Sequence, residues 1–317
     1  MCLQVVPPGG LVSRASSLDK GTSADTMRII YGWQEALTEA GGLERAGMTG
    51  LPDYHYVKPP VIEVAIGVQF APLMEFSVGH VGMYWATIRE TFNRVEEQAP
   101  IAHILEPPHG PSEPVPAWQF MDKPELPRVW FLDATGCRII QVQRDRFLHN
   151  WRKVNPSDEY PRFPSVREGF LRYWGGFNAF LAENNLKPQP DQCELTYVNH
   201  IKKGDGWNTI AELEKVFPTF AWKTRSGFLP EPDSARWSLR FLLPESTGRL
   251  HVDVVPVRVP PQNDPVVRYS LTARGRPRGE FSTKGMNEWF AIAHEWIVRA
   301  FADLVDKNTD AIWEKTV

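Results

Sequence analysis

Amide and arginine side chains recur at alternate positions between Gln141 and Arg152. Gln141 and Gln143 stand two residues apart, so in a strand their side chains would point to the same side of a sheet. Asn150 and Arg152 repeat this spacing a few residues later. Arginine offers a planar fork of donors, and amides both donate and accept, so the set could bind an anionic or amide-bearing ligand. The more ordinary interpretation is that these residues satisfy a turn and pair with surface carboxylates.

Three further residues could carry metal or acid–base chemistry. His251 and Asp253 lie two residues apart on one predicted strand, and His200 lies on another. A metal site would need all three to converge at about 2 Å from one ion, whereas a histidine and an aspartate could instead transfer a proton. This is the basis of an alternative hypothesis, a metal-assisted or acid–base hydrolytic enzyme. The more ordinary interpretation is a pair of partly buried histidines with satisfied hydrogen bonds, and no cofactor is predicted.

Motifs of several enzyme classes are missing. The chain has no GxGxxG, GxxxxGKS/T or GxSxG motif, which removes the main support for a Rossmann, P-loop or serine-hydrolase function. His294 and Glu295 lack the second histidine of a zinc protease motif. Glu63 and Glu194 stand in otherwise apolar or small segments, where pairing with arginines on a neighbouring strand is more ordinary than glycosidase-like catalysis.

Composition excludes several classes of protein. Hydrophobic residues make up 42% of the 317 and charged residues 23%, which argues against a disordered chain or a coiled coil. The formal net charge of -3 gives no general attraction to nucleic acid or anionic lipid, so a nucleic-acid partner is not expected. Cys2, Cys137 and Cys193 form no CxxC pair, which argues against structural zinc and favours a reducing, cytoplasmic compartment.

We expect three regions along the chain. Residues 1–50 are rich in glycine, proline, serine and threonine, without a secretory signal or a run long enough to span a membrane. They are predicted to be a disordered extension, with Met27 and Met48 as further possible starts of the folded part. Residues 51–190 and 191–317 are predicted to be the two halves of one joint α+β domain.

The first half begins with a strand at Val61–Phe70, because apolar residues alternate there with Glu63 and Gln69 among the polar or small ones. Apolar residues at three- and four-residue intervals from Val81 to Val95 predict a helix. A proline-rich loop over residues 100–127 follows, which we interpret as a lid or packing arm. Three strands and a long helix complete this half, at 128–133, 137–143, 147–153 and 166–181.

Gly175 and Gly176 lie inside that long helix. Because glycine weakens a helix, we expect a close contact with another backbone there.

The second half repeats this order. We predict a strand at 193–201, a short helix at 207–217, a hairpin at 236–243 and 249–257, a strand at 266–274 and a helix at 286–306. Both halves then read strand, helix, three strands, helix, which suggests a tandem duplication. The hairpins favour a curved, mainly antiparallel sheet with both long helices on its convex side and an open polar face opposite.

Three motifs carry a resemblance: KPPVIEV at 58–64, QVQRDRF at 141–147 and HNWR at 149–152. On these the chain resembles a sporadically distributed prokaryotic family of unknown function, over residues 48–315. The family's motifs bring no catalytic roles, so no residue role is implied. The resemblance implies a stand-alone, cytoplasmic accessory protein and no particular reaction.

The leading hypothesis is therefore a non-catalytic binding or accessory protein. Its open sheet face would bind a macromolecular partner or a small polar ligand, and membranes are not expected as partners. A homodimer could form through the proline-rich loop and the tryptophans near loops and strand ends, Trp118, Trp151 and Trp207. The predicted ligand-binding residues are Gln69, Gln141, Gln143, Asn150, Arg152, His200, His251 and Asp253.

Overall fold

The computed structural model describes residues 54–107, 126–224 and 226–316. The predicted extension over residues 1–50, Trp118 and most of the proline-rich loop lie outside the described residues. The elements of the described part follow in chain order. They are β1 (His55–Tyr56), β2 (Val61–Phe70), α2 (Val78–Ile88), β3 (Arg94–Gln98), β4 (Arg128–Leu132), β5 (Arg138–Gln143), β6 (Arg146–Arg152), α3 (Arg162–Glu183), β7 (Pro190–Lys202), the 3₁₀ helix η2 (Ile210–Lys215), β8 (Trp237–Leu242), the 3₁₀ helix η3 (Pro244–Ser246), β9 (Gly248–Val259), β10 (Asp264–Gly275), α4 (Thr283–Leu304), α5 (Asn308–Ile312) and β11 (Lys315–Thr316).

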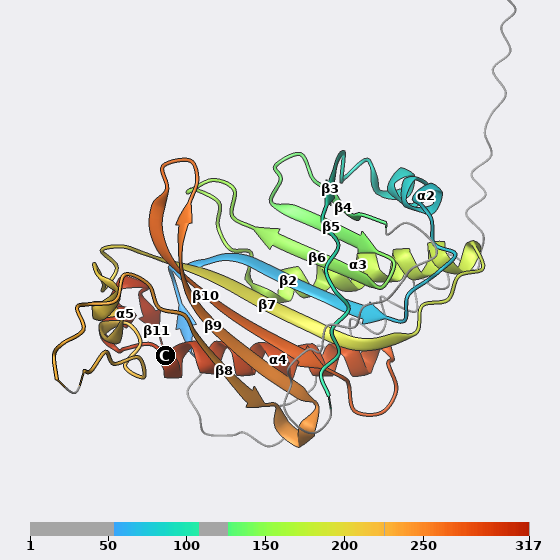
Figure 1. The fold of residues 1–317 in the computed structure, drawn as a ribbon. Coiled ribbons are helices and arrows are strands. Elements are labelled where there is room, and N and C mark those ends of the chain that lie inside the picture. The colour runs from blue at the N-terminus through green and yellow to red at the C-terminus, as the bar shows by residue number, and fades with distance from the viewer. Residues whose placement is uncertain (1–53, 108–125, 225, 317) are drawn as a thin grey trace, which may run out of the picture.

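Nine strands form one sheet in the order β3-β4-β5-β6-β2-β7-β10-β9-β8 (Figure 1). Every neighbouring pair is antiparallel, so the prediction of an α+β fold with a mainly antiparallel sheet is confirmed. The long strands β2 and β7 pair at the centre, and β3 and β8 are the outer strands. A separate two-stranded sheet joins β1 to β11.

One side of the sheet packs against the two long helices. Helix α3 contacts β6 and β2, and α4 contacts β7, β10 and β9 (Figure 1). On β2 the alternate residues Val64, Ile66, Val68 and Phe70 are fully buried in the core, as the period of a strand with one apolar side requires. The helices meet this surface with apolar residues at three- and four-residue spacing, such as Phe170, Trp174, Phe177 and Phe290.

The helix predicted from Val81 to Val95 is too long. Helix α2 ends at Ile88, and residues 94–98 form the strand β3, which pairs with β4. Phe92 is fully buried between the two elements, and the Trp85 Nε1 donates to its carbonyl oxygen over 2.9 Å. This anchored turn ends the helix although the apolar spacing continues to Val95.

Two further expectations about local packing are wrong, the close contact at Gly176 and the exposed tryptophans. A Cβ added at Gly176 would meet nothing within 4 Å, whereas one at Gly169 would lie 2.6 Å from the His149 ring. The close approach in α3 is therefore made at Gly169, to a side chain. Trp151 and Trp207 are buried in the core and do not form an exposed contact surface.

The segment predicted as a helix at 207–217 contains only the short 3₁₀ helix η2. Within the described residues, no helix has the length and apolar character needed to cross a membrane.

Candidate functional site

The side of the sheet opposite α3 and α4 is polar, and we call it the open face. Paired residues of antiparallel strands point to the same side. Val68 is paired with Phe147 on the helix-packed side, so Gln69 and its partner Arg146 point to the other. The same register applied strand by strand places all eight predicted site residues on the open face: Gln69, Gln141, Gln143, Asn150, Arg152, His200, His251 and Asp253.

Gln141 is the centre of a buried hydrogen-bond network on β4, β5 and β6. Its Oε1 accepts from Arg128 Nη1 over 2.8 Å and from Trp130 Nε1 over 2.9 Å. Its Nε2 donates to Asn150 Oδ1 over 2.8 Å, and Asn150 Nδ2 donates to Glu63 Oε1 over 2.6 Å. Every polar atom of the Gln141 amide is thus engaged within the protein, which assigns this residue a structural role in holding the sheet.

Burial raises the pKa of Glu63, against the opposing effects of the Asn150 hydrogen bond and of the Arg152 and Arg128 charges. Arg152 belongs to the same network. Its Nε donates to the Gly136 carbonyl over 3.0 Å, and its guanidinium lies 5.5 Å from the centre of the Trp130 ring. In this part of the open face the polar side chains bond to one another and to the backbone of the same chain.

Residues 99–107, which we call the crossing segment, run across one end of the open face. Gln143 binds the backbone of Ile101 twice, accepting from its N–H and donating to its carbonyl, each over 2.9 Å. Arg146 Nη2 donates to the Ala102 carbonyl over 2.8 Å and to Gln69 Oε1 over 3.0 Å. Two of the predicted site residues therefore hold a segment of the same chain, Gln143 directly and Gln69 through Arg146.

Gln192, on β7, binds the crossing segment as Gln143 does. It donates to the Ile104 carbonyl over 2.8 Å and accepts from the Glu106 N–H over 2.7 Å. The Glu106 carboxylate then reaches β9, where it contacts His251 Nε2 and, over 3.4 Å, Arg249 Nη1. His251 is thereby occupied by a carboxylate of the same chain.

His103 joins the middle of the crossing segment to the sheet through two carboxylates. Its Nδ1 lies 2.9 Å from Asp145 Oδ2, and its Nε2 lies 3.2 Å from Asp191 Oδ2. The hydrogen bonds to these carboxylates raise the pKa of His103 to about 9, although partial burial opposes the rise. At neutral pH the ring is therefore protonated and bridges the two acids.

Raising the pH from 6.5 through 9 is expected to loosen the crossing segment. An unfolded histidine titrates near pH 6.5, so the raised pKa of His103 stabilises the fold fully below that pH, and this stabilisation is lost as the pH rises through about 9. Hydrogen exchange at the Ile101 and Glu106 amides, corrected for its intrinsic pH dependence, should accelerate across this window. In a His103→Gln chain exchange should already be faster and lack the step; parallel profiles for the two chains would contradict the prediction.

The part of the open face formed by β7, β10, β9 and β8 is half-exposed. Polar side chains pair across it: Glu194 Oε2 accepts from Arg274 Nε over 2.6 Å, and the hydroxyls of Thr196 and Thr272 lie 3.0 Å apart. Ser238 Oγ donates to Asp253 Oδ1 over 2.5 Å.

The described residues give the His200 ring no hydrogen-bond partner. Burial and the neighbouring Arg268 lower its pKa, so at neutral pH His200 is an uncharged ring that can donate once and accept once.

The metal site that the alternative hypothesis would need at His200, His251 and Asp253 does not form. In the pairing register, His251 is in line with Thr196 of β7, two strands away, and His200 lies four residues further along β7. The two histidines are thus separated by about 10 Å across the strands and about 13 Å along them. Among the described residues, no group of three histidine, cysteine, aspartate or glutamate side chains is placed to hold a metal ion.

Sequence reasoning missed the residues that fasten the crossing segment. Gln192 follows the alternation of β7 and could have been identified as an open-face residue together with Glu194. His103 and Glu106 lie in a loop, and no periodic signal indicates where a loop crosses a sheet. Comparison with protein-family models, curated proteins and solved structures found no match to this chain, so the resemblance based on its three motifs stays a prediction.

Proposed function

We propose that this chain is a non-catalytic binding protein whose open face holds an extended polypeptide segment of a partner. The observation that carries the proposal is the way the face already binds polypeptide. Gln143 and Gln192 each donate to one backbone carbonyl and accept from one backbone N–H of the crossing segment. Side-chain amides that pair with main-chain groups bind an extended chain largely irrespective of its sequence.

The half-exposed part of the face is the place we assign to the partner. The neutral ring of His200 and the carboxylate of Asp253 there offer one donor and several acceptors to a peptide backbone or to polar side chains. Asp253 is bonded to a single hydroxyl, that of the exposed Ser238. Neither residue supports the core, so both can contribute to binding without loss of stability.

We infer that the face arose from duplication of one unit, residues 51–190 and 191–317. Supporting this inference, the strand order outward from the β2–β7 pair is β6, β5, β4 on one side and β10, β9, β8 on the other. In each half a long helix, α3 or α4, follows the last strand that the half contributes to the large sheet. Two like units joined at their first strands would provide a polar face long enough to hold an extended segment.

A phage-displayed library of random linear peptides is a suitable probe, panned on the immobilised full-length chain. Selected peptides should bind the protein saturably with one site per chain. The double change His200→Ala and Asp253→Ala should weaken them about tenfold, the effect of losing one or two hydrogen bonds, with little change in melting temperature.

The matched control is Glu288→Ala, at an exposed position of α4 away from the open face, and it should leave the affinity unchanged. Failure to enrich any peptide, or equal binding by the double variant, would refute the proposed function.

A further inference from the structure

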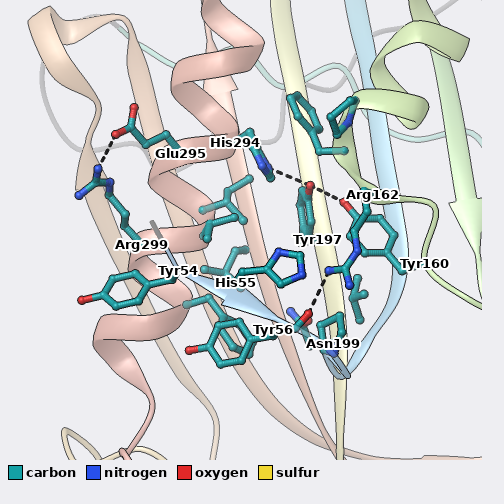
Figure 2. Close-up of a pocket in the computed structure, with 18 of the residues that line it drawn as sticks. Tyr54, His55, Tyr56, Tyr160, Arg162, Tyr197, Asn199, His294, Glu295 and Arg299 are labelled. Atoms are coloured by element: carbon teal, nitrogen blue, oxygen red, sulfur yellow. Dashed lines mark hydrogen bonds and ion pairs between the residues drawn. The ribbon is translucent and has the colours of Figure 1, made fainter. Parts of the chain in front are cut away.

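A cavity of about 610 Å³ lies on the helix-packed side of the sheet, distinct from the open face. Residues from β1, the start of α3, the central strand β7 and helix α4 line it (Figure 2). Tyr197 of β7 projects into it, while the next residues in either direction along the strand face the opposite side of the sheet. The volume is in the range that accommodates a small organic ligand.

Three side chains in the wall form a hydrogen-bonded chain. The Tyr197 hydroxyl lies 2.8 Å from the Tyr160 hydroxyl and 3.0 Å from His294 Nδ1 (Figure 2). A phenol has one proton, so Tyr197 donates to one neighbour and accepts from the other. When His294 donates to Tyr197, Tyr197 donates to Tyr160, and the Tyr160 proton is left for a ligand oxygen. These three hydrogen-bonded side chains can thus present a hydrogen-bond donor to an anion.

Arg162 brings a positive charge to the same wall. Its Nη1 donates to the Tyr56 carbonyl over 3.0 Å, and its guanidinium lies 5.8 Å from the centre of the Tyr160 ring. Among the described residues, no carboxylate lies within ion-pair distance of it. Arg162 also has a backbone φ of 68°, a conformation that residues other than glycine seldom adopt, so its position is fixed at a cost in backbone strain.

The remaining wall is mostly apolar, with aromatic and aliphatic side chains, and its other charged pair is balanced. The Phe163 ring stacks on His294 with centres 4.0 Å apart, and Tyr56 packs edge-on against Phe301. Glu295 is paired with Arg299 over 2.8 Å, so their charges offset each other. Arg162 therefore sets the sign of the charge in a cavity whose walls are aromatic and aliphatic.

We propose that this cavity binds a small aromatic anion, a carboxylate or sulfonate on a ring system. The Arg162 guanidinium and the Tyr160 hydroxyl hold the acid group, and the aromatic side chains surround the ring. Fixed donors for one charged group within an otherwise largely apolar enclosure give both orientation and affinity. This site is independent of the polypeptide-binding function proposed for the open face.

The test uses two fluorescent probes that differ only by a sulfonate group, anilinonaphthalene sulfonate and its uncharged analogue phenylnaphthylamine. On the full-length chain the sulfonate should bind saturably with one site per chain. Arg162→Gln should weaken the sulfonate at least tenfold and change the affinity of the uncharged probe less than twofold, because it removes a charge-assisted hydrogen bond. Tyr160→Phe should weaken the sulfonate severalfold by removing the terminal donor.

Arg167→Gln is the matched control. Arg167 is a half-buried arginine five residues further along α3, outside the cavity wall, and its guanidinium lies 5.4 Å from the centre of the Phe163 ring. This change should leave both affinities unaltered. An absence of saturable binding, an unchanged sulfonate affinity in Arg162→Gln, or an equal loss for both probes would overturn the proposal. Arg162→Lys, which keeps the charge but not the planar fork, should retain part of the sulfonate affinity.

Discussion

Replacing Phe147 by alanine is expected to lower the free energy of unfolding by about 3–5 kcal/mol, the usual cost of removing a fully buried aromatic ring. Phe147 is completely buried on β6. Its ring centre lies 5.0 Å from that of Phe177 and 5.7 Å from that of Trp174, both on α3. The ring of Tyr84 on α2 closes the cluster at 6.4 Å. The truncation would leave a cavity where a strand and two helices meet, and urea unfolding should measure the loss.

Phe228→Ala is the matched control for this experiment. Phe228 is 86% exposed, so the same chemical change there should alter the free energy of unfolding by less than about 0.5 kcal/mol. A loss of under about 1 kcal/mol in Phe147→Ala would contradict the packing described for α3 against β6.

Lowering the pH from 6.5 to 4 is expected to cost about 3 kcal/mol of stability through His149 alone. Burial lowers the pKa of His149 to about 4, with a smaller opposing effect of its hydrogen bond to the Val166 carbonyl and further lowering by Arg138 and Arg172. Its Nε2 is buried without a hydrogen bond. Between these pH values the unfolded chain protonates the histidine and the folded chain does not, so acid favours unfolding. Below about pH 4 this contribution stops growing.

His149→Leu isolates the effect, because it replaces the titrating ring by an apolar side chain. Carboxylates titrate in both proteins, so the difference between their curves of unfolding free energy against pH reports His149. The variant should lose about 3 kcal/mol less than the parent chain across the window. Parallel curves would show that the ring protonates in the folded state as readily as in the unfolded one. The sign is opposite to that for His103, whose contribution is lost in alkaline solution.

Much of the fold could be predicted because it is encoded at short range. The alternation in residues 61–70 corresponds to β2, and the apolar stripe expected over 286–306 corresponds to α4. What could not be predicted depends on distant residues. The spacing of apolar residues continues past Ile88, but Phe92 is buried in a turn and β3 finds its partner in β4, some thirty residues away. The spacing of apolar residues within either segment does not indicate a pairing partner at that distance in the sequence.

The candidate site divides in the same way. Alternation alone sufficed to place residues such as Gln141 and His200 on one face, since it needs only the period of a strand. It could not reveal that the Gln141 amide forms hydrogen bonds with Arg128, Trp130 and Asn150, because these bonds depend on the register of the strands. The cavity residues Tyr160 and Arg162 lie at the entry to α3 in a stretch without regular spacing. Only the tertiary structure, in which Tyr160 contacts Tyr197 and all three residues line one cavity, shows that they share a wall.

The two edge strands of the large sheet differ in the side chains that they expose to solvent. The five residues of β3 include Arg94, Glu96 and Glu97, and charges of this kind discourage a foreign strand from adding to an edge. At the other rim, β8 exposes the apolar side chains of Phe241 and Leu242 beside main-chain groups that have no further neighbour in the sheet of the described residues. Aggregation by edge-to-edge pairing of strands would therefore start at β8. At high protein concentration this is the edge to which a strand of another copy could add most easily.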